Sequence, residues 1–323
     1  MMQRFSYQRA ASVREAAASS ARPGARILAG GTDLLGCLRD EIFTASTVVS
    51  LSGIKELKGI GARSGGGLRI GAMTTLTEVA ESKEVLTGYP VLAQAALAAA
   101  SPQLRNQGTI GGNICQRSRC WYYRGRFNCL RKGGDTCYAA GGENEFHCIF
   151  GGAPCFMVHP SDIAPALMAL DARATIVGSR GTRTIPISSF YVLPEKSVTN
   201  ETVLAPGDVV TEILLPAPAA GAKSMYRKVR VRGAFDFATV GAAINLTVSG
   251  GKVGSARIVL SGVAPVPWRS AEAEKALAGN SLDAATATAA GEAAVKGASP
   301  LEKNEYKVLM VRGVLEESLA ALA

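Results

Sequence analysis

Six of the seven cysteines fall within forty-one residues, as Cys115, Cys120, Cys129, Cys137, Cys148 and Cys155. Thiolates bind soft metals, and four of them suit an iron–sulfur cluster or a zinc ion. The stretch 115–155 shows neither the helical nor the strand period, and a structureless segment of this length is unusual in a compact domain. Metal-bound thiolates would provide the staple that such a segment needs.

The size and composition indicate a globular chain. Its 323 residues suggest two or three domains, and its 47% hydrophobic content can bury real cores. The longest apolar run, 91–100, is far short of the roughly 20 residues of a membrane span, so we expect no spanning segment. No secretory signal is visible, so we expect a cytoplasmic protein, or a periplasmic one carried there by a signal-bearing partner. An odd number of cysteines also argues against a disulfide framework.

The net charge of +9 raises the question of an acidic partner. The densest basic run, 227–232, alternates with apolar residues as a half-buried strand does, and no RNA-reading motif lies beside it. We therefore predict a solvated basic surface or a protein partner, and no nucleic acid.

The order of the expected elements predicts an α+β protein. Strands are expected at 26–29, 47–51, 68–72, 174–177, 182–187 and 208–215, and helices at 90–100 and 162–170. Residues 101–113 are expected to form a loop, and the sequence PAPAAG at 216–221 is the best linker. Beyond it, strands at 224–231, 238–248 and 256–262 precede helices at 271–277, 283–295 and 301–322. We predict one domain over 1–220 with a cysteine-rich insertion at about 115–158, and a second over 221–323.

Two glycine turns are candidates for phosphate binding, because glycine lets backbone N–H groups approach phosphate oxygens closely. They read Gly30-Gly31-Thr32-Asp33 and Thr109-Ile110-Gly111-Gly112-Asn113. Each alone is more often a tight turn, but two in one domain favour a grip on a pyrophosphate. Neither is a Walker loop or a Rossmann G-x-G-x-x-G, which makes FAD on another fold a better candidate than NAD.

These turns resemble the two flavin-pyrophosphate motifs of the FAD-binding medium subunits of the xanthine dehydrogenase, or molybdenum hydroxylase, family. The start Phe5-Ser6-Tyr7, the pair Ser161-Asp162, and Lys228 ahead of the string RGAFDF at 232–237 match as well. The resemblance covers essentially the whole chain. It implies an FAD-binding domain of the vanillyl-alcohol-oxidase type in two subdomains, followed by the α+β C-terminal domain of carbon monoxide dehydrogenase flavoproteins.

The resemblance also implies which residues contact FAD, whose attachment should be non-covalent because neither turn contains histidine. In the family the two turns supply main-chain N–H groups to the diphosphate, Asp162 reaches a polar part of the cofactor, and Leu215 and Lys228 lie near the isoalloxazine. A plain core role is an equal alternative for Leu215. The candidate FAD-binding residues are Leu28, Ala29, Gly30, Gly31, Thr32, Asp33, Leu34, Thr109, Ile110, Gly111, Gly112, Asn113, Asp162, Leu215 and Lys228.

A minority of the family carries an extra [4Fe–4S] cluster at the position of the cysteine segment. The string QRSRCWYYR at 116–124 resembles the periplasmic aldehyde oxidoreductase type, and 4-hydroxybenzoyl-CoA reductase is the other such type. The resemblance selects four ligands, Cys120, Cys129, Cys137 and Cys155. Replacement of one ligand by Cys148 or Cys115 remains an alternative, and zinc is the weaker choice of metal because no C-x-x-C pair is present.

The implied function is electron transfer within a three-part oxidoreductase. A molybdopterin-binding large subunit would oxidise an aldehyde, and a small subunit with [2Fe–2S] clusters would pass the electrons to FAD on this chain. The flavin would then reduce an external electron acceptor. The alternatives are a 4-hydroxybenzoyl-CoA reductase-like enzyme with reversed electron flow, a stand-alone flavin oxidase, and a zinc-stapled assembly subunit without redox work.

Overall fold

The computed structural model describes residues 2–323, and its N-terminal part is a small parallel sheet. Strands β1 (Ser6–Arg9), β3 (Thr47–Ser50) and β2 (Ala25–Leu28) pair in that order, and helix α1 (Val13–Ser20) crosses from β1 to β2. Val48 and Val49 are fully buried in the central strand, where β-branched side chains pack well. Helix α2 (Leu34–Arg39) follows β2 directly, which puts the first glycine turn at the carboxyl end of that strand.

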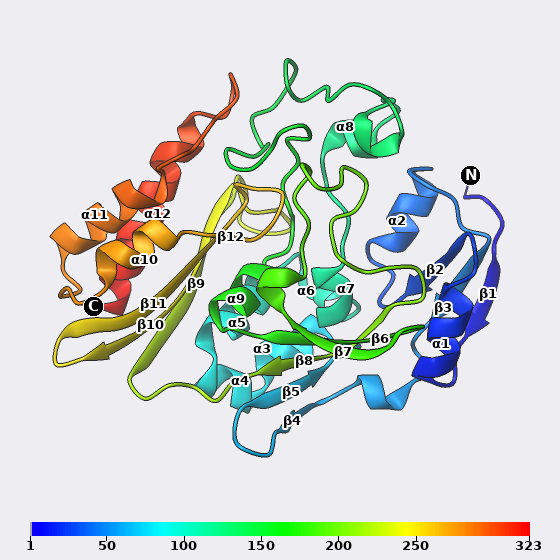
Figure 1. Ribbon diagram of the computed structural model, residues 1–323, viewed down its shortest axis with the longest axis horizontal. Coiled ribbons are helices and arrows are strands. Elements are labelled where there is room, and N and C mark those ends of the chain that lie inside the picture. The colour runs from blue at the N-terminus through cyan, green and yellow to red at the C-terminus, as the bar shows by residue number, and fades with distance from the viewer. Residues whose placement is uncertain (1) are drawn as a thin grey trace.

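A five-stranded antiparallel sheet forms the second subdomain (Figure 1). Its order is β4 (Ile60–Ala62), β5 (Leu68–Gly71), β8 (Val209–Leu215), β6 (Arg173–Gly178) and β7 (Gly181–Pro186). The largest core lies between this sheet and helices α3 (Leu76–Glu81), α4 (Lys83–Gly88), α5 (Pro90–Ala98) and α9 (Ile163–Ala169). Two short 3-10 turns, η1 (Lys55–Leu57) and η3 (Ile187–Ser189), lie in the connections between these elements.

The expectation of a continuous loop over 101–113 is wrong, because two short helices interrupt it. They are α6 (Pro102–Arg105) and α7 (Ile110–Ile114). Ser101 and Thr109 each accept a hydrogen bond from a backbone N–H three residues on, which satisfies one of the free donors of a helix start. The two glycines of the second turn therefore lie inside a helical turn.

The C-terminal part is a four-stranded antiparallel sheet covered by three helices, at the left of Figure 1. Strands β12 (Trp268–Arg269), β11 (Lys252–Ser261), β10 (Val240–Ser249) and β9 (Ala222–Val229) pair in that order. Helices α10 (Ala271–Leu277), α11 (Ala284–Ala294) and α12 (Tyr306–Leu322) share a core with the sheet. Helix α12 begins five residues later than predicted, because Leu301 donates to the Asn304 side chain in a preceding turn. The α+β fold class is confirmed.

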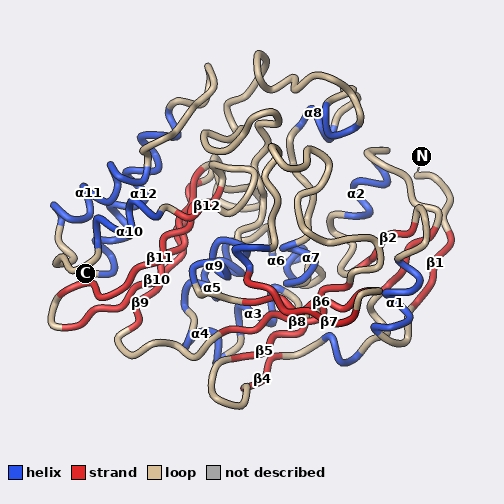
Figure 2. Tube along the Cα trace, in the orientation of Figure 1, coloured by secondary structure: helices blue, strands red, loops and turns tan. Residues whose placement is uncertain are grey.

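The cysteine segment crosses the upper part of the molecule mostly as loop (Figure 2). Its regular pieces are helix α8 (Trp121–Arg124) and the 3-10 turn η2 (Leu130–Lys132). Its second half is attached to the C-terminal domain, since Ile149 and Phe150 both donate to the Val263 carbonyl, at 2.8 and 3.1 Å. The segment thus connects the two parts of the chain.

Residues 2–323 include no helix with the length and apolar character needed to cross a bilayer.

The capping box of α3 gives a stability prediction. The Thr75 side chain accepts from the Glu78 backbone N–H, and the Glu78 carboxylate accepts from the Thr75 N–H at 2.7 Å. We expect Thr75→Ala to lower the free energy of unfolding by about 1 kcal/mol. In the matched control, Thr87→Ala, an exposed hydroxyl that bonds only the Lys83 carbonyl is removed, and the change should stay within about 0.5 kcal/mol. Urea titration followed by circular dichroism measures both, and equal losses would contradict the prediction.

Candidate functional site

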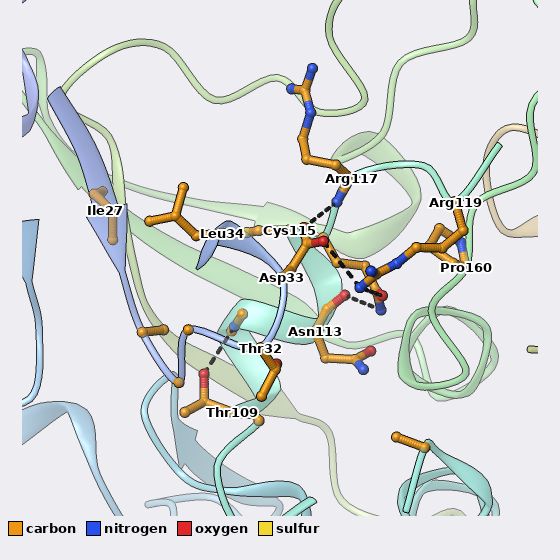
Figure 3. Close-up of a pocket in the computed structure, with 18 of the residues that line it drawn as sticks. Ile27, Thr32, Asp33, Leu34, Thr109, Asn113, Cys115, Arg117, Arg119 and Pro160 are labelled. Atoms are coloured by element: carbon orange, nitrogen blue, oxygen red, sulfur yellow. Dashed lines mark hydrogen bonds and ion pairs between the residues drawn. The ribbon is translucent and has the colours of Figure 1, made fainter. Parts of the chain in front are cut away.

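A cavity of about 940 Å³ lies where the two glycine turns meet. Eleven of the fifteen candidate FAD-binding residues line it, drawn from both turns and from the start of α9. Figure 3 shows Thr32, Asp33, Thr109 and Asn113 around the opening. The structure therefore brings together, in one cavity, two turns that lie almost eighty residues apart in the sequence.

The first turn is packed so tightly that only glycine fits. A Cβ on Gly30 would lie 1.8 Å from the Gln107 carbonyl oxygen, and Gly31 has φ +78°. The backbone N–H groups from Gly30 to Leu34 donate to no acceptor within residues 2–323. Five donors therefore remain available at the edge of the cavity.

The second turn contributes differently, because its N–H groups are already used. Ile110 and Gly111 donate to the Thr74 and Ala72 carbonyls, both at 2.9 Å. Gly112 donates to the Thr109 hydroxyl at 3.1 Å and Asn113 to the Thr109 carbonyl at 2.8 Å. The main chain of this turn is hydrogen-bonded to the segment that follows β5. The turn therefore contributes to the cavity through its glycines, which lack side chains, and through the Asn113 side chain.

Asp33, at the end of the first turn, is held by the cysteine segment (Figure 3). One carboxylate oxygen accepts from the Arg117 N–H at 2.7 Å, and the other pairs with Arg119 at 3.0 Å and with Arg124 at 2.7 Å. The side chain of Asp33 is only 17% exposed, so the pairs are partly shielded from water. The position of the first turn thus depends on the start of the cysteine segment.

Sequence reasoning missed the arginines that line the cavity: Arg26, Arg39, Arg117, Arg119, Arg131 and Arg232. A concentration of guanidinium groups in one cavity suits an anionic ligand, and phosphate in particular. The string QRSR at 116–119 was the available signal, since it begins three residues after the second turn. Arg26 and Arg39 flank the first turn in β2 and α2, and only the tertiary structure brings in Arg131 and Arg232 from more distant segments.

Asp162 lines the cavity and is the centre of a buried polar network. Its carboxylate accepts from the Tyr226 hydroxyl at 2.6 Å and pairs with the Lys228 ammonium at 2.8 Å. Burial raises the pKa of Asp162, and the adjacent Lys228 opposes that rise. Lys228 itself does not line the cavity and reaches it only through Asp162.

Three other candidates also lie outside the lining. Leu215, at the end of β8, pairs with Leu68 of β5 and is fully buried in the largest core, as the alternative of a plain core residue requires. Ile110 is fully buried in the same core, and Leu28 packs in a small cluster behind β2. Their side chains shape the backbone around the cavity without facing it.

The four predicted cluster cysteines line one second cavity, beside the first. Cys120, Cys129, Cys137 and Cys155 are spread over thirty-six residues of the segment, and His147 is the remaining Cys or His in the lining. The other three cysteines are absent from this lining, and Cys115 borders the larger cavity instead. The lining of this cavity therefore contains the predicted set of four and none of the other three cysteines.

The thiols of this second cavity differ in how readily they ionise. Cys137 and Cys155 share a hydrogen bond that lowers the pKa of Cys137 to about 6 and raises that of Cys155. Burial raises the pKa of Cys120 to about 11, and that of Cys148, outside the cavity, to about 12. Within residues 2–323, no three Cys, His, Asp or Glu side chains converge on a single point that could hold one metal ion.

The two cavities share a wall formed by Tyr123 and Arg131, which line both. Tyr123 is 2% exposed, and the Arg131 guanidinium lies 5.4 Å from the centre of its ring. Glu201, also buried, pairs with Arg131 and, at 2.8 Å, with Arg117. The side chains of Tyr123 and Arg131 thus lie between the glycine-lined cavity and the cysteine-lined one.

Comparison with known proteins extends over both parts of the chain. Residues 3–218 match the family described as the FAD binding domain in molybdopterin dehydrogenase, and residues 224–322 match the CO dehydrogenase flavoprotein C-terminal domain. The aldehyde oxidoreductase FAD-binding subunit PaoB of Escherichia coli is 38% identical, with 99% of this chain and 98% of that protein covered. The carbon monoxide dehydrogenase medium chain of Hydrogenophaga pseudoflava is 30% identical, with 98% and 96% covered.

Solved structures agree with the sequence matches. Carbon monoxide dehydrogenase from Hydrogenophaga pseudoflava, in a form lacking the Mo-pyranopterin moiety, superimposes with a TM-score of 0.79 at 30% identity, covering 100% of this chain and 98% of that one. Quinoline 2-oxidoreductase from Pseudomonas putida 86 gives a TM-score of 0.78 at 25% identity, with the same coverage. The chain therefore belongs to the family of FAD-binding subunits of molybdopterin-dependent oxidoreductases.

Proposed function

We propose that this chain is the FAD- and [4Fe–4S]-binding electron-transfer subunit of a heterotrimeric, molybdenum-dependent aldehyde oxidoreductase. Its partners would be a molybdopterin-binding large subunit and a small subunit with [2Fe–2S] clusters, and its FAD would reduce an external acceptor. The observation that carries the proposal is the pair of adjoining cavities, one lined by the glycine turns and the other by the four cysteines.

The residues of the larger cavity fit FAD. The five free N–H groups from Gly30 to Leu34 would donate to its diphosphate, and the surrounding arginines would balance its charge. Asp162, held by Tyr226 and Lys228, would present a carboxylate to the other end of the cofactor. When bound, FAD would take up single electrons from the iron–sulfur clusters and could pass them on as a pair, which suits a junction between one-electron and two-electron carriers.

The residues of the smaller cavity fit a four-iron cluster better than one zinc ion. A cubane cluster takes four thiolates on four separate irons, whereas zinc requires its ligands around one point. Four cysteines border one cavity, and no C-x-x-C pair of the kind typical of zinc sites lies among them.

The aldehyde substrate is supported by the relative that matches at 38% identity over nearly its whole length and is named an aldehyde oxidoreductase subunit. The string QRSRCWYYR at 116–124 supports the same class. In a reductase of aromatic CoA thioesters the electrons would instead flow from the cysteine cavity toward the partner. Identification of the physiological donor or acceptor separates these two directions.

The grip on FAD is tested by Gly30→Ala. The added Cβ would meet the Gln107 carbonyl and push the two turns apart, a strain of about 1–3 kcal/mol. We expect roughly tenfold weaker FAD retention, measured as flavin absorbance per protein after gel filtration. The matched control is Gly36→Ala, three residues beyond the turn in α2, where an added Cβ meets nothing within 4 Å. Full flavin content in Gly30→Ala, or equal loss in both variants, would argue against this binding mode.

The cluster is tested by Cys129→Ser with Cys148→Ala as its control. Cys129 lines the cysteine cavity, whereas Cys148 is equally buried but lies outside it. In the anaerobically purified complex, we expect Cys129→Ser to lose four irons per trimer and retain FAD, and Cys148→Ala to retain both. Iron, zinc and flavin analysis with EPR of the reduced state measures this. Zinc in place of iron, or loss of FAD without loss of iron, would refute the assignment.

A further inference from the structure

A histidine ring faces one of the four cysteine sulfurs from inside the cysteine cavity. The Nε2 atom of His147 lies 3.2 Å from the Sγ atom of Cys120. His147 is only 3% exposed and lines the same cavity as Cys120. The rings of Trp121 and Tyr122 pack on it from α8, with centroids 5.7 and 6.0 Å away, and exclude water from that side.

The ring has a polar contact through only one of its two nitrogens within residues 2–323. Nε2 faces the Cys120 sulfur, whereas Nδ1 has no hydrogen-bond partner there. Beside a thiolate only the tautomer with the proton on Nε2 is attractive, because the other would point a lone pair at the negative sulfur.

The C-terminal domain fixes this ring by holding its backbone. The Lys307 ammonium, fully buried in α12, donates to the carbonyls of His147 at 2.9 Å and Gly262 at 2.8 Å. The buried Asn304 side chain donates to the same His147 carbonyl at 3.1 Å. His147 itself donates through its N–H to the Asn144 carbonyl at 2.9 Å. Residues at the start of α12 therefore hold the backbone from which the His147 ring projects.

We propose that His147 is a positioning residue that donates an Nε2–H···S hydrogen bond to the Cys120 thiolate and raises the reduction potential of the metal cluster held there. The inference rests on the proposed [4Fe–4S] site. It adds a hydrogen bond that would set the reduction potential of the cluster. Residues at the start of α12, in the C-terminal domain, hold the histidine that makes this bond.

The direction of the effect follows from charge. Reduction adds one electron to a cluster and its thiolates, so a hydrogen bond to a ligand sulfur stabilises the reduced form more than the oxidised form. The hydrogen bond is stronger in a cavity from which water is excluded, because the local dielectric constant is low there. Removal of the donor should therefore lower the potential.

The test compares His147→Phe, which keeps a ring and removes the donor, with His147→Gln, which keeps a side-chain N–H. Potentials are measured in the purified complex by redox titration with low-temperature EPR. For His147→Phe we expect at least about a tenfold lower reduced-to-oxidised ratio at a fixed ambient potential, equivalent to about 59 mV for one electron. His147→Gln should recover part of that shift, and Cys148→Ala should show none. An unchanged potential in His147→Phe with full iron content would overturn the proposal.

A second measurement needs no substitution that could impair folding. The chain has two histidines, so wild-type complex labelled with 15N-histidine is compared by pulsed EPR with an equally labelled His147→Gln complex. We expect weak nitrogen coupling to the reduced cluster in the wild type and its loss in the variant. Absence of coupling, or coupling as strong as that of a nitrogen bound to iron, would overturn the hydrogen bond. Wild-type protein with no iron beyond that of its partners would instead refute the proposed function.

Discussion

The carboxylate of Asp33 is the contact on which the site depends. It ends the first glycine turn and is held by the Arg117 backbone N–H and by the side chains of Arg119 and Arg124, all from the cysteine segment. Charge-assisted hydrogen bonds of this kind are strong when partly buried, and loss of one partner leaves the other uncompensated. The cavity edge with its free N–H groups and the cysteine-lined cavity are therefore parts of one structure.

The wall between the two cavities is also built from buried ion pairs. Arg117 and Arg131 both pair with the buried Glu201, and both guanidinium groups lie near the face of Tyr123. Two cations against one buried anion leave a net positive wall, which favours negative groups on either side. A diphosphate in the larger cavity and an anionic thiolate cluster in the smaller one would both be stabilised by it.

The cysteine segment also depends on the C-terminal domain. The buried Lys307 and Asn304 hold the carbonyls of His147 and Cys148, and Val263 accepts two backbone hydrogen bonds from the segment. Burial disfavours the charged ammonium and lowers the pKa of Lys307 to about 7. The burial of a lysine here makes sense as a means of fixing a loop that has little regular structure of its own.

The sequence by itself determined the α+β class, the two glycine turns and the segment that concentrates the cysteines, because turns, strand periodicity and cysteine spacing are local features. It also gave, through the family resemblance, the four cysteines that line one cavity. It failed over 101–113, where Ser101 and Thr109 cap short helices that have too few residues to show a period. Only the tertiary structure decided that the main chain of the second turn is bonded to the segment after β5, that Leu215 belongs to the core, and that Arg131 and Arg232 reach the cavity from distant segments. The same holds for His147 beside Cys120, because contacts between residues remote in the chain arise from packing and leave no local pattern in the sequence.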